Sequence, residues 1–293
     1  MKEQIRIGSR ESKLAVTQAE IIKALILKHF PAFAVEIITM KTTGDMILDR
    51  NLDQIGGKGL FVKELDIALM ENRIDLAVHS LKDMPMEIPA AYPVFAYSKR
   101  EDPRDVLIYK PGSDEIPEGG IIATSSKRRM IQLQKLYPQS QFTNIRGNVQ
   151  TRLRKLAEQD LDGTVLAAAG VNRLHLEAVI GRVFSIEEVL PAAGQGILAL
   201  QGNQKMKALL KDAINDQDSE VAALSERGFI TELDGGCSSP IAAYAEVGEQ
   251  IILSGLYYRE SDQTYYIEKK TGARADAFEL GVSLAKEMRE TYG

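Results

Sequence analysis

Residues 5–40 read IRIGSRESKLAVTQAEIIKALILKHFPAFAVEIITM, and this stretch decides the fold class. Ile5 to Gly8 predicts a short strand, Lys13 to His29 a helix that Pro31 ends, and Val35 to Met40 a second strand. A strand–helix–strand order indicates a parallel sheet with helices on its faces. Arg10 and Ser12 then follow the end of the first strand, which is the edge where open α/β sheets bind ligands.

A second strand end also carries polar residues. Ile74 to His79 predicts a buried strand, and Lys82 and Asp83 follow it ahead of Pro85. A lysine and a carboxylate side by side at a strand end are suited to the chemistry of a site, and the plain alternative is a solvated turn. After another strand at Val94 to Tyr97, the charged run 99–104 is interpreted as a hinge into a second domain.

Three strand-to-helix junctions in that second domain each supply arginine. Hydroxyl residues after Ile121–Ala123 are typical helix caps, and with the arginines that follow they form an anion cradle. Residues 121–173 hold nine basic and three acidic residues in a chain of net charge −5, which indicates an anionic ligand. A solvated basic surface is the alternative. The junction residues are Thr124, Ser125, Ser126, Arg128, Arg129, Arg146, Gly147, Arg152 and Arg173.

The glycine-rich stretch 56–59 contains Lys58 but fails the P-loop pattern, since no Ser or Thr follows the lysine. We interpret it as a mobile lid ahead of a helix over 60–72, with an ordinary loop as the alternative.

Cys237 is the only cysteine, and it lies in Gly-Gly-Cys-Ser-Ser-Pro between a predicted helix, Ser219 to Leu233, and a predicted strand from Ile241. Further strands over 246–275 and a helix over 277–290 predict a small α+β domain. A lone cysteine is often a buried apolar residue, and the competing interpretation is a nucleophile or covalent anchor.

Composition narrows the class of protein. A chain of 293 residues with 44% apolar content supports two or three domains. One cysteine excludes an intramolecular disulfide, and no apolar run approaches the ~20 residues of a membrane span. With no signal segment apparent, we expect a cytoplasmic protein that binds neither membrane nor nucleic acid. The three histidines lack metal-ligand spacing, so we expect no metal site.

Taken together, these motifs resemble the porphobilinogen deaminase (hydroxymethylbilane synthase) family over nearly the whole chain. The segments that carry the resemblance are Ile7–Arg10, Gly56–Glu64, Ala77–Pro85, Arg100–Asp105, Thr124–Ser126, Arg128–Arg129, Arg146–Val149, Thr151–Leu153 and Gly235–Cys237.

The resemblance implies two periplasmic-binding-protein-like α/β domains joined by a hinge, plus a small α+β C-terminal domain. The expected boundaries are 1–98 with 194–216, then 99–193, then 217–293. It also implies a monomer that joins four porphobilinogens, with loss of ammonia, on a dipyrromethane cofactor bound to Cys237 through a thioether.

By the same resemblance, Asp83 is the catalytic carboxylate. The residues implied to hold the cofactor are Cys237, Lys82, Asp83, Ser125, Ser126, Arg128, Arg129, Arg146, Gly147 and Arg152. Those implied to hold the substrate are Arg10, Ser12, Phe61, Lys58, Thr124, Arg146, Arg173 and Gln195. Arginine suits this task, because its planar fork binds carboxylates bidentately and each pyrrole brings two.

Some positions depart from the family pattern: Ala123, Lys127, His175, Gln201 and Asn203. These departures suggest one alternative hypothesis, that the protein is a poorly active paralogue of the family. A second rival is a hinge-type anion-binding protein, which would also have two α/β domains and a basic cleft.

Overall fold

The computed structural model describes residues 4–46, 62–234 and 240–293. Within it, the chain forms two compact units, Met1–Arg100 with Ile197–Glu220, and Glu101–Gly196 with Val221–Gly293. The first unit begins with the expected strand, helix and strand, which are β1 (Gln4–Arg10), α1 (Lys13–His29) and β2 (Ala34–Met40). Strand β1 pairs in parallel with β2 and with β3 (Leu76–Ser80), so the predicted parallel sheet is confirmed.

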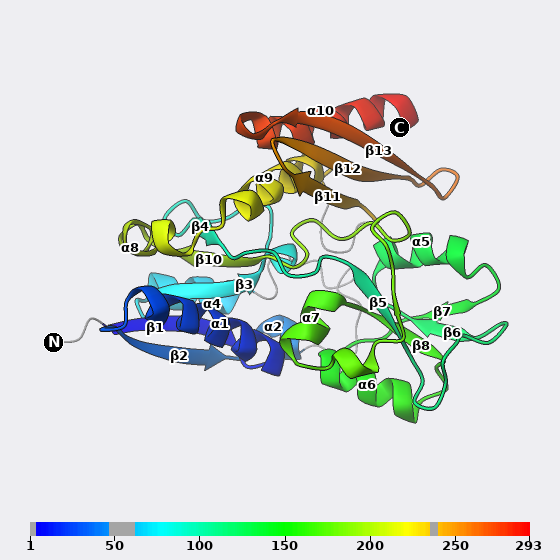
Figure 1. Cartoon of the computed structure of the whole chain (residues 1–293), viewed down its shortest axis with the longest axis horizontal. Coiled ribbons are helices and arrows are strands. Elements are labelled where there is room, and N and C mark those ends of the chain that lie inside the picture. The colour runs from blue at the N-terminus through cyan, green and yellow to red at the C-terminus, as the bar shows by residue number, and fades with distance from the viewer. Residues whose placement is uncertain (1–3, 47–61, 235–239) are drawn as a thin grey trace. The chain divides into compact units, whose positions relative to one another are not determined.

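The first sheet has five strands in the order β2-β1-β3-β10-β4 (Figure 1). Strand β10 (Leu198–Gly202) lies antiparallel between β3 and β4 (Val94–Tyr97). In the core of this unit, Ile22 and Ile26 of α1 pack against apolar side chains of the sheet. Leu210, from the helix that follows β10, belongs to the same cluster. The other elements of the unit are α2 (Thr43–Met46), α4 (Lys63–Met70), the 3-10 helix η1 (Leu81–Asp83) and α8 (Gln204–Ile214).

The second unit contains another five-stranded sheet, in the order β7-β6-β8-β5-β9. Its strands are β5 (Asp105–Tyr109), β6 (Ile121–Ala123), β7 (Gln141–Thr143), β8 (Gly163–Ala167) and β9 (Arg182–Val183). The helices between them are α5 (Lys127–Leu136), α6 (Val149–Glu158), α7 (Ala168–Arg173) and η2 (Glu177–Val179). Strands β7, β6 and β8 run parallel, whereas β5 is antiparallel to β8 and pairs also with β9.

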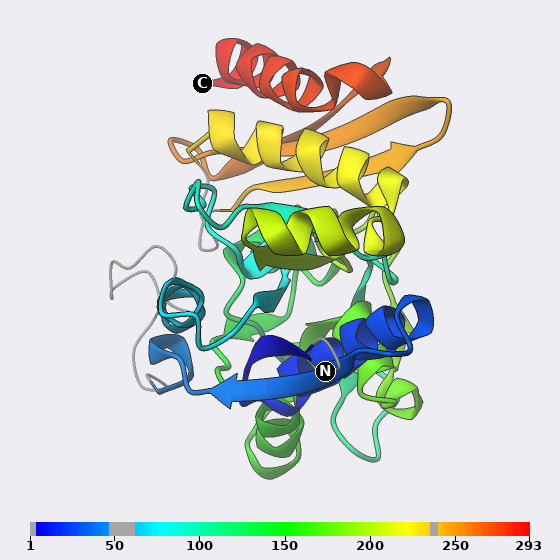
Figure 2. The ribbon, with the colours of Figure 1, turned by 90° about the vertical axis from the view of Figure 1, so that its left-hand side faces the viewer.

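The C-terminal part of the second unit is an antiparallel sheet of β11 (Ala242–Val247), β12 (Gln250–Arg259) and β13 (Thr264–Ala273). After η3 (Arg274–Asp276), helix α10 (Ala277–Tyr292) runs along this sheet (Figure 2). Helix α9 (Gln217–Glu232) approaches α10 closely, since a Cβ at Gly281 would lie 2.1 Å from the carbonyl oxygen of Ser225. Glycine is therefore required where the two helices touch.

Two α/β sheets and a small α+β C-terminal part confirm the predicted fold class. Among the described residues, no helix is long and apolar enough to cross a membrane.

Candidate functional site

In the first unit, the predicted polar residues lie at one edge of the sheet. Arg10 is the last residue of β1, and Lys82 and Asp83 belong to η1, directly after the parallel neighbour β3. All three side chains are half-buried. The turn that carries them is fixed at its start, because the Leu81 amide donates to the carbonyl of Ile197 at 3.0 Å.

Two further contacts fix this edge. The amide group of Gln18 on α1 donates to Ser80 Oγ at 2.9 Å, which ties the helix to the end of β3. Ser12 caps α1, since its Oγ accepts from the Ala15 amide at 3.3 Å. The structure thus gives Ser12 a role in shaping the helix start, beside the substrate contact that the resemblance implies.

In the second unit, the three arginine-bearing junctions also share an edge, because β7, β6 and β8 are adjacent and parallel. The first junction is linked to the second by Ser125, whose Oγ donates to the Ile145 carbonyl at 2.7 Å and accepts from the Ile145 amide at 3.1 Å. Ser126 caps α5, and Thr124 is buried, with its Oγ1 accepting from the Ser126 amide. Ser125 therefore holds the two loops together, while the hydroxyls of Thr124 and Ser126 order the start of α5.

The second junction is held by side chains of the helix that follows it. Arg152 Nε donates to the Gly147 carbonyl at 2.9 Å, and Lys155 Nζ donates to the Arg146 carbonyl at 3.0 Å. Gly147 has a φ of 116°, and a Cβ there would lie 2.5 Å from Thr151 Cγ2, so no other residue fits this turn. Arg146 and Arg152 are half-buried.

Arg173, at the third junction, donates from Nη2 to the Gly196 carbonyl at 2.6 Å. Burial lowers its pKa to about 10, although Glu101 opposes the shift. Glu101 also accepts from the Asn172 side chain, and its own amide donates to the Gly196 carbonyl. Arg173 is thus fixed beside the segment that leads out of the second unit.

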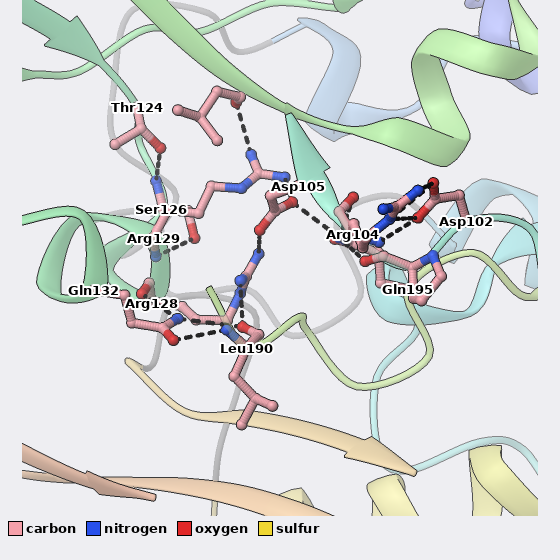
Figure 3. A network of polar contacts seen from close by, with 12 residues as sticks. Asp102, Arg104, Asp105, Thr124, Ser126, Arg128, Arg129, Gln132, Leu190 and Gln195 are labelled. Atoms are coloured by element: carbon pink, nitrogen blue, oxygen red, sulfur yellow. Dashed lines mark hydrogen bonds and ion pairs between the residues drawn. The ribbon is translucent and has the colours of Figure 1, made fainter. Parts of the chain in front are cut away.

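Arg128 and Arg129 point into the second unit and meet one carboxylate (Figure 3). Asp105 Oδ1 accepts from Arg129 Nη2 at 2.7 Å, and its Oδ2 lies 2.9 Å from Arg128 Nη2. Gln195 Nε2 donates to the same Oδ1 at 2.9 Å. The exposed fractions are 4% for Arg128, 6% for Arg129 and 0% for both Asp105 and Gln195.

This cluster was only partly foreseen. Arg128, Arg129 and Gln195 were predicted to be ligand contacts, and no role was predicted for Asp105. The sequence does contain one indication of a buried carboxylate. Asp105 directly precedes Val106, Leu107 and Ile108, an apolar run that forms the buried strand β5.

Three of the expected site residues, Lys58, Phe61 and Cys237, lie outside the described residues, as do the glycine-rich stretch and the lid expected there. In the part of the chain that the structure describes, no group of His, Cys, Asp or Glu residues is arranged to hold a metal ion.

Four of the five residues that depart from the expected family pattern occupy positions that shape the fold. His175 has a left-handed backbone just after α7, and Asn203 caps α8 by accepting from the Met206 amide. Ala123 is buried in β6, and Gln201 is buried in β10. Lys127 is exposed at the start of α5.

Comparison with known proteins gives the same assignment along nearly the whole chain. The family model "Porphobilinogen deaminase, dipyromethane cofactor binding domain" matches residues 5–211, and "Porphobilinogen deaminase, C-terminal domain" matches residues 221–290. A porphobilinogen deaminase of Acetivibrio thermocellus is 51% identical over 286 residues, covering 97% of this chain and 98% of the relative. Another, of Ruminiclostridium josui, is 50% identical over 289 residues, 98% of each chain.

A solved structure is also similar. The periplasmic aliphatic sulphonate binding protein SsuA of Escherichia coli aligns with a TM-score of 0.40 at 12% identity, covering 80% of this chain and 71% of that one.

Proposed function

The chain belongs to the porphobilinogen deaminase family, and we propose that it joins four porphobilinogen molecules head to tail into a linear tetrapyrrole. Each addition forms one carbon–carbon bond and expels one ammonia, and one water enters when the product is released. A dipyrromethane group, bound through a thioether to Cys237, supplies the pyrrole carbon that is the acceptor for the first addition. We assign a monomer to this activity, and a cytoplasmic location, which the single cysteine supports.

The observation that carries the proposal is the buried charge of the second unit. Arg128 and Arg129 face one carboxylate, so the cluster keeps a net positive charge away from water. Arg129 Nε is buried and has no hydrogen-bond partner among the described residues. An unsatisfied buried donor costs about 1–3 kcal/mol, and a bound carboxylate would provide the missing acceptor.

The remaining basic residues fit the same group. A dipyrromethane with acetate and propionate side chains brings four carboxylates, and the edge formed by β7, β6 and β8 offers Arg146, Arg152 and Arg173 from three loops. Charge-assisted bonds from arginine to carboxylate are short, strong and directional. We therefore assign cofactor binding to Ser125, Ser126, Arg128, Arg129, Arg146, Gly147 and Arg152, and also to Lys82 and Asp83.

Substrate binding is assigned to Arg10, Ser12, Thr124, Arg146, Arg173 and Gln195, and to Lys58 and Phe61 from the segment outside the described residues. Asp83 is assigned the catalytic role. Its carboxylate accepts the pyrrole N–H and opposes the positive charge that develops as ammonia leaves. Electrostatic stabilisation by preorganised groups is commonly the largest single contribution to catalysis, and a carboxylate has the sign that a developing cation requires.

Intact mass measurement of the purified chain tests this function. We expect a mass greater than that of the sequence by one dipyrromethane unit, with peptide mapping locating the addition at Cys237. Cys237→Ala is expected to remove the adduct and the activity together. Tetrapyrrole production by a chain whose Cys237 is unmodified would overturn the assignment.

A further inference from the structure

Asp105 is the common partner of two buried arginines. It is the first residue of β5, its side chain is wholly buried, and each of its oxygens faces a different guanidinium (Figure 3). Its carboxylate contacts Arg128, Arg129 and Gln195, and the residue is 0% exposed.

The convergence of the two arginines requires such a partner. Arg128 and Arg129 are consecutive on α5, so their Cα–Cβ bonds leave the helix about 100° apart. Each guanidinium has a second anchor: Arg128 Nη1 donates to the Leu190 carbonyl at 2.7 Å, and Arg129 Nη1 donates to the Val165 carbonyl at 2.9 Å. With Asp105 as the shared anchor, each planar group is held at two points.

Electrostatics point the same way. Two guanidinium groups without a carboxylate between them would be buried like charges, whose desolvation costs several kcal/mol for each ion. Burial alone would raise the pKa of Asp105, but the charges of Arg128 and Arg129 hold that pKa well below its usual range. The carboxylate is therefore ionised at neutral pH, and the cluster of Asp105, Arg128 and Arg129 retains one net positive charge.

Hydrogen bonds also connect this cluster to two loop segments, one around residue 103 and one over residues 190–195. Gln195 Nε2 donates to the Pro103 carbonyl at 2.6 Å as well as to Asp105. Gln132 on α5 donates to the Leu190 carbonyl at 3.2 Å and accepts from the Leu190 amide at 2.8 Å. The orientation of the arginines is thus fixed relative to the segments around residues 103 and 190–195.

We propose that Asp105 is a positioning residue for the reaction: it sets the orientation of Arg128 and Arg129 and limits their net charge to that of one cation, so that they receive a ligand carboxylate in a fixed geometry. The inference rests on the proposed function, since the ligand is the polycarboxylate group assigned there. Asp105 itself does not touch the ligand, and it acts through the two arginines.

The test compares Asp105→Asn with the matched control Asp75→Asn. Asp75 is also paired with an arginine, accepting from Arg6 Nε at 3.1 Å and Nη2 at 2.9 Å, but it belongs to no proposed binding site. The readout is the share of chains that carry the mass adduct, measured only in the folded, monodisperse fraction. We expect at least about a ten-fold loss of adduct for Asp105→Asn and parental loading for Asp75→Asn. Full loading of folded Asp105→Asn would overturn the proposal.

Asp105→Glu separates position from charge, because it keeps the carboxylate and moves it by one methylene. A positioning role predicts that the folded Glu variant also loads poorly, whereas charge balance alone predicts parental loading, which would contradict the proposal. If neither variant folds, nitrogen-15 NMR of the parent chain still decides. We expect separate, slowly averaging Nη signals for Arg128 and Arg129, and rapid averaging would show that the pair is not held.

Failure of the underlying function is distinguishable. If the parent chain itself carries no adduct, the proposed function is wrong, and the NMR measurement alone then tests whether Asp105 holds the arginines. If the parent carries the adduct and folded Asp105→Asn matches it, only the positioning role is wrong.

Discussion

The imidazole of His79 faces the side-chain amide of Gln201, with Nε2 2.9 Å from Oε1. The other end of the amide donates to Asp66 Oδ1 at 2.8 Å and to the Tyr92 carbonyl at 3.1 Å. Since both amide protons are used, Oε1 must accept, and the proton of the neutral imidazole lies on Nε2. The Nε2 atom of the buried ring therefore meets a neutral amide and not a carboxylate.

Burial therefore lowers the pKa of His79 to about 4, and the hydrogen bond with Gln201 opposes the shift only in part. Between pH 6.5 and 4 the unfolded chain binds a proton that the folded chain does not. We expect the free energy of unfolding to decrease as the pH falls through this range, by up to about 3 kcal/mol from His79. Burial raises the pKa of Asp66, so protonation of that carboxyl offsets part of the loss.

The measurement is urea unfolding at several pH values, with the His79 ring followed by NMR. Gln201→Glu is the informative variant, because a carboxylate beside the ring raises the pKa of His79 in the folded state, which the NMR titration detects directly. An imidazole that titrates near pH 6.5 in the folded parent would show that the ring is not held as described.

His175 occupies the position after α7 that favours glycine. Its φ is 54°, its amide donates to the Asn172 carbonyl, and the Leu176 amide donates to the Val171 carbonyl, the pattern of a Schellman motif. A left-handed residue with a side chain costs about 1–2 kcal/mol, and glycine gives back about 0.4–1 kcal/mol in the unfolded state. We expect His175→Gly to raise the free energy of unfolding by about 0.5–1 kcal/mol.

Asn72 provides the matched control. It has a φ of 55° after α4, and the amides of Asn72 and Arg73 donate to the carbonyls of Leu69 and Ala68 in the same motif. Asparagine tolerates this backbone better than histidine does, so Asn72→Gly is expected to gain less. Equal gains from both substitutions, measured by urea unfolding, would refute the explanation for His175.

Local periodicity was sufficient to predict most of the elements. The helix over Lys13 to His29 was placed at its observed bounds, because Ala15, Gln18, Ala19, Ile22 and Ile26 form one buried face. Strand β10 was not among the elements predicted from the sequence. Leu198–Gly202 is a strand because it hydrogen-bonds antiparallel to β3 and β4, and those partners are more than a hundred residues away along the chain.

The candidate site was predictable to a similar degree. The residue types and the three strand-to-helix junctions could be read from the sequence, since parallel strands bring their ends together. The direction of a side chain could not. Arg128 and Arg129 belong to a run of three basic residues, and a run of that kind is typical of a solvated surface. Their guanidinium groups are buried because they pair with Asp105 and donate to the carbonyls of Leu190 and Val165, partners that local sequence does not reveal.

Arg146→Ala is expected to impair cofactor loading more than folding. The loop around Arg146 is held through its carbonyl, by Lys155, and through Gly147, by Arg152, and neither bond needs the Arg146 side chain. Loss of a desolvated partner of a carboxylate costs about 2–5 kcal/mol in binding. Arg154→Ala on the same helix is the control. Arg154 is exposed, and its Nε lies 3.9 Å from Glu158 Oε2, which is a loose ion pair on the surface.

The paired readouts are adduct content and thermal stability. Arg152→Ala is expected to affect both, since it also removes the bond to the Gly147 carbonyl. A collapse of stability in Arg146→Ala, with full adduct in the molecules that stay folded, would make Arg146 a structural residue.

Asp83→Asn is expected to fold, because the turn around Asp83 is held by other groups. Buried Leu81 and Met84 flank the residue pair, and the Met84 amide donates to the Leu81 carbonyl at 3.1 Å. The half-buried Asp83 side chain is therefore presented by a fixed backbone at the end of β3. An amide keeps the shape of the carboxylate but not its charge.

Loss of the Asp83 charge is expected to raise the activation free energy of the chemical step. Removing one preorganised contact with a developing charge typically costs about 2.7–4 kcal/mol, or roughly 10²–10³ in rate. The arginines cannot replace Asp83, since their charge has the wrong sign to stabilise a cation. The measurement is single-turnover addition of porphobilinogen to the loaded variant, so that cofactor assembly is not confused with chain extension. Exposed Glu87, four residues further along, gives the control Glu87→Gln, for which parental extension is expected. Near-normal extension by Asp83→Asn would move the catalytic role to another carboxylate, and Asp45 and Asp53, whose side chains lie outside the described part, would be tested next.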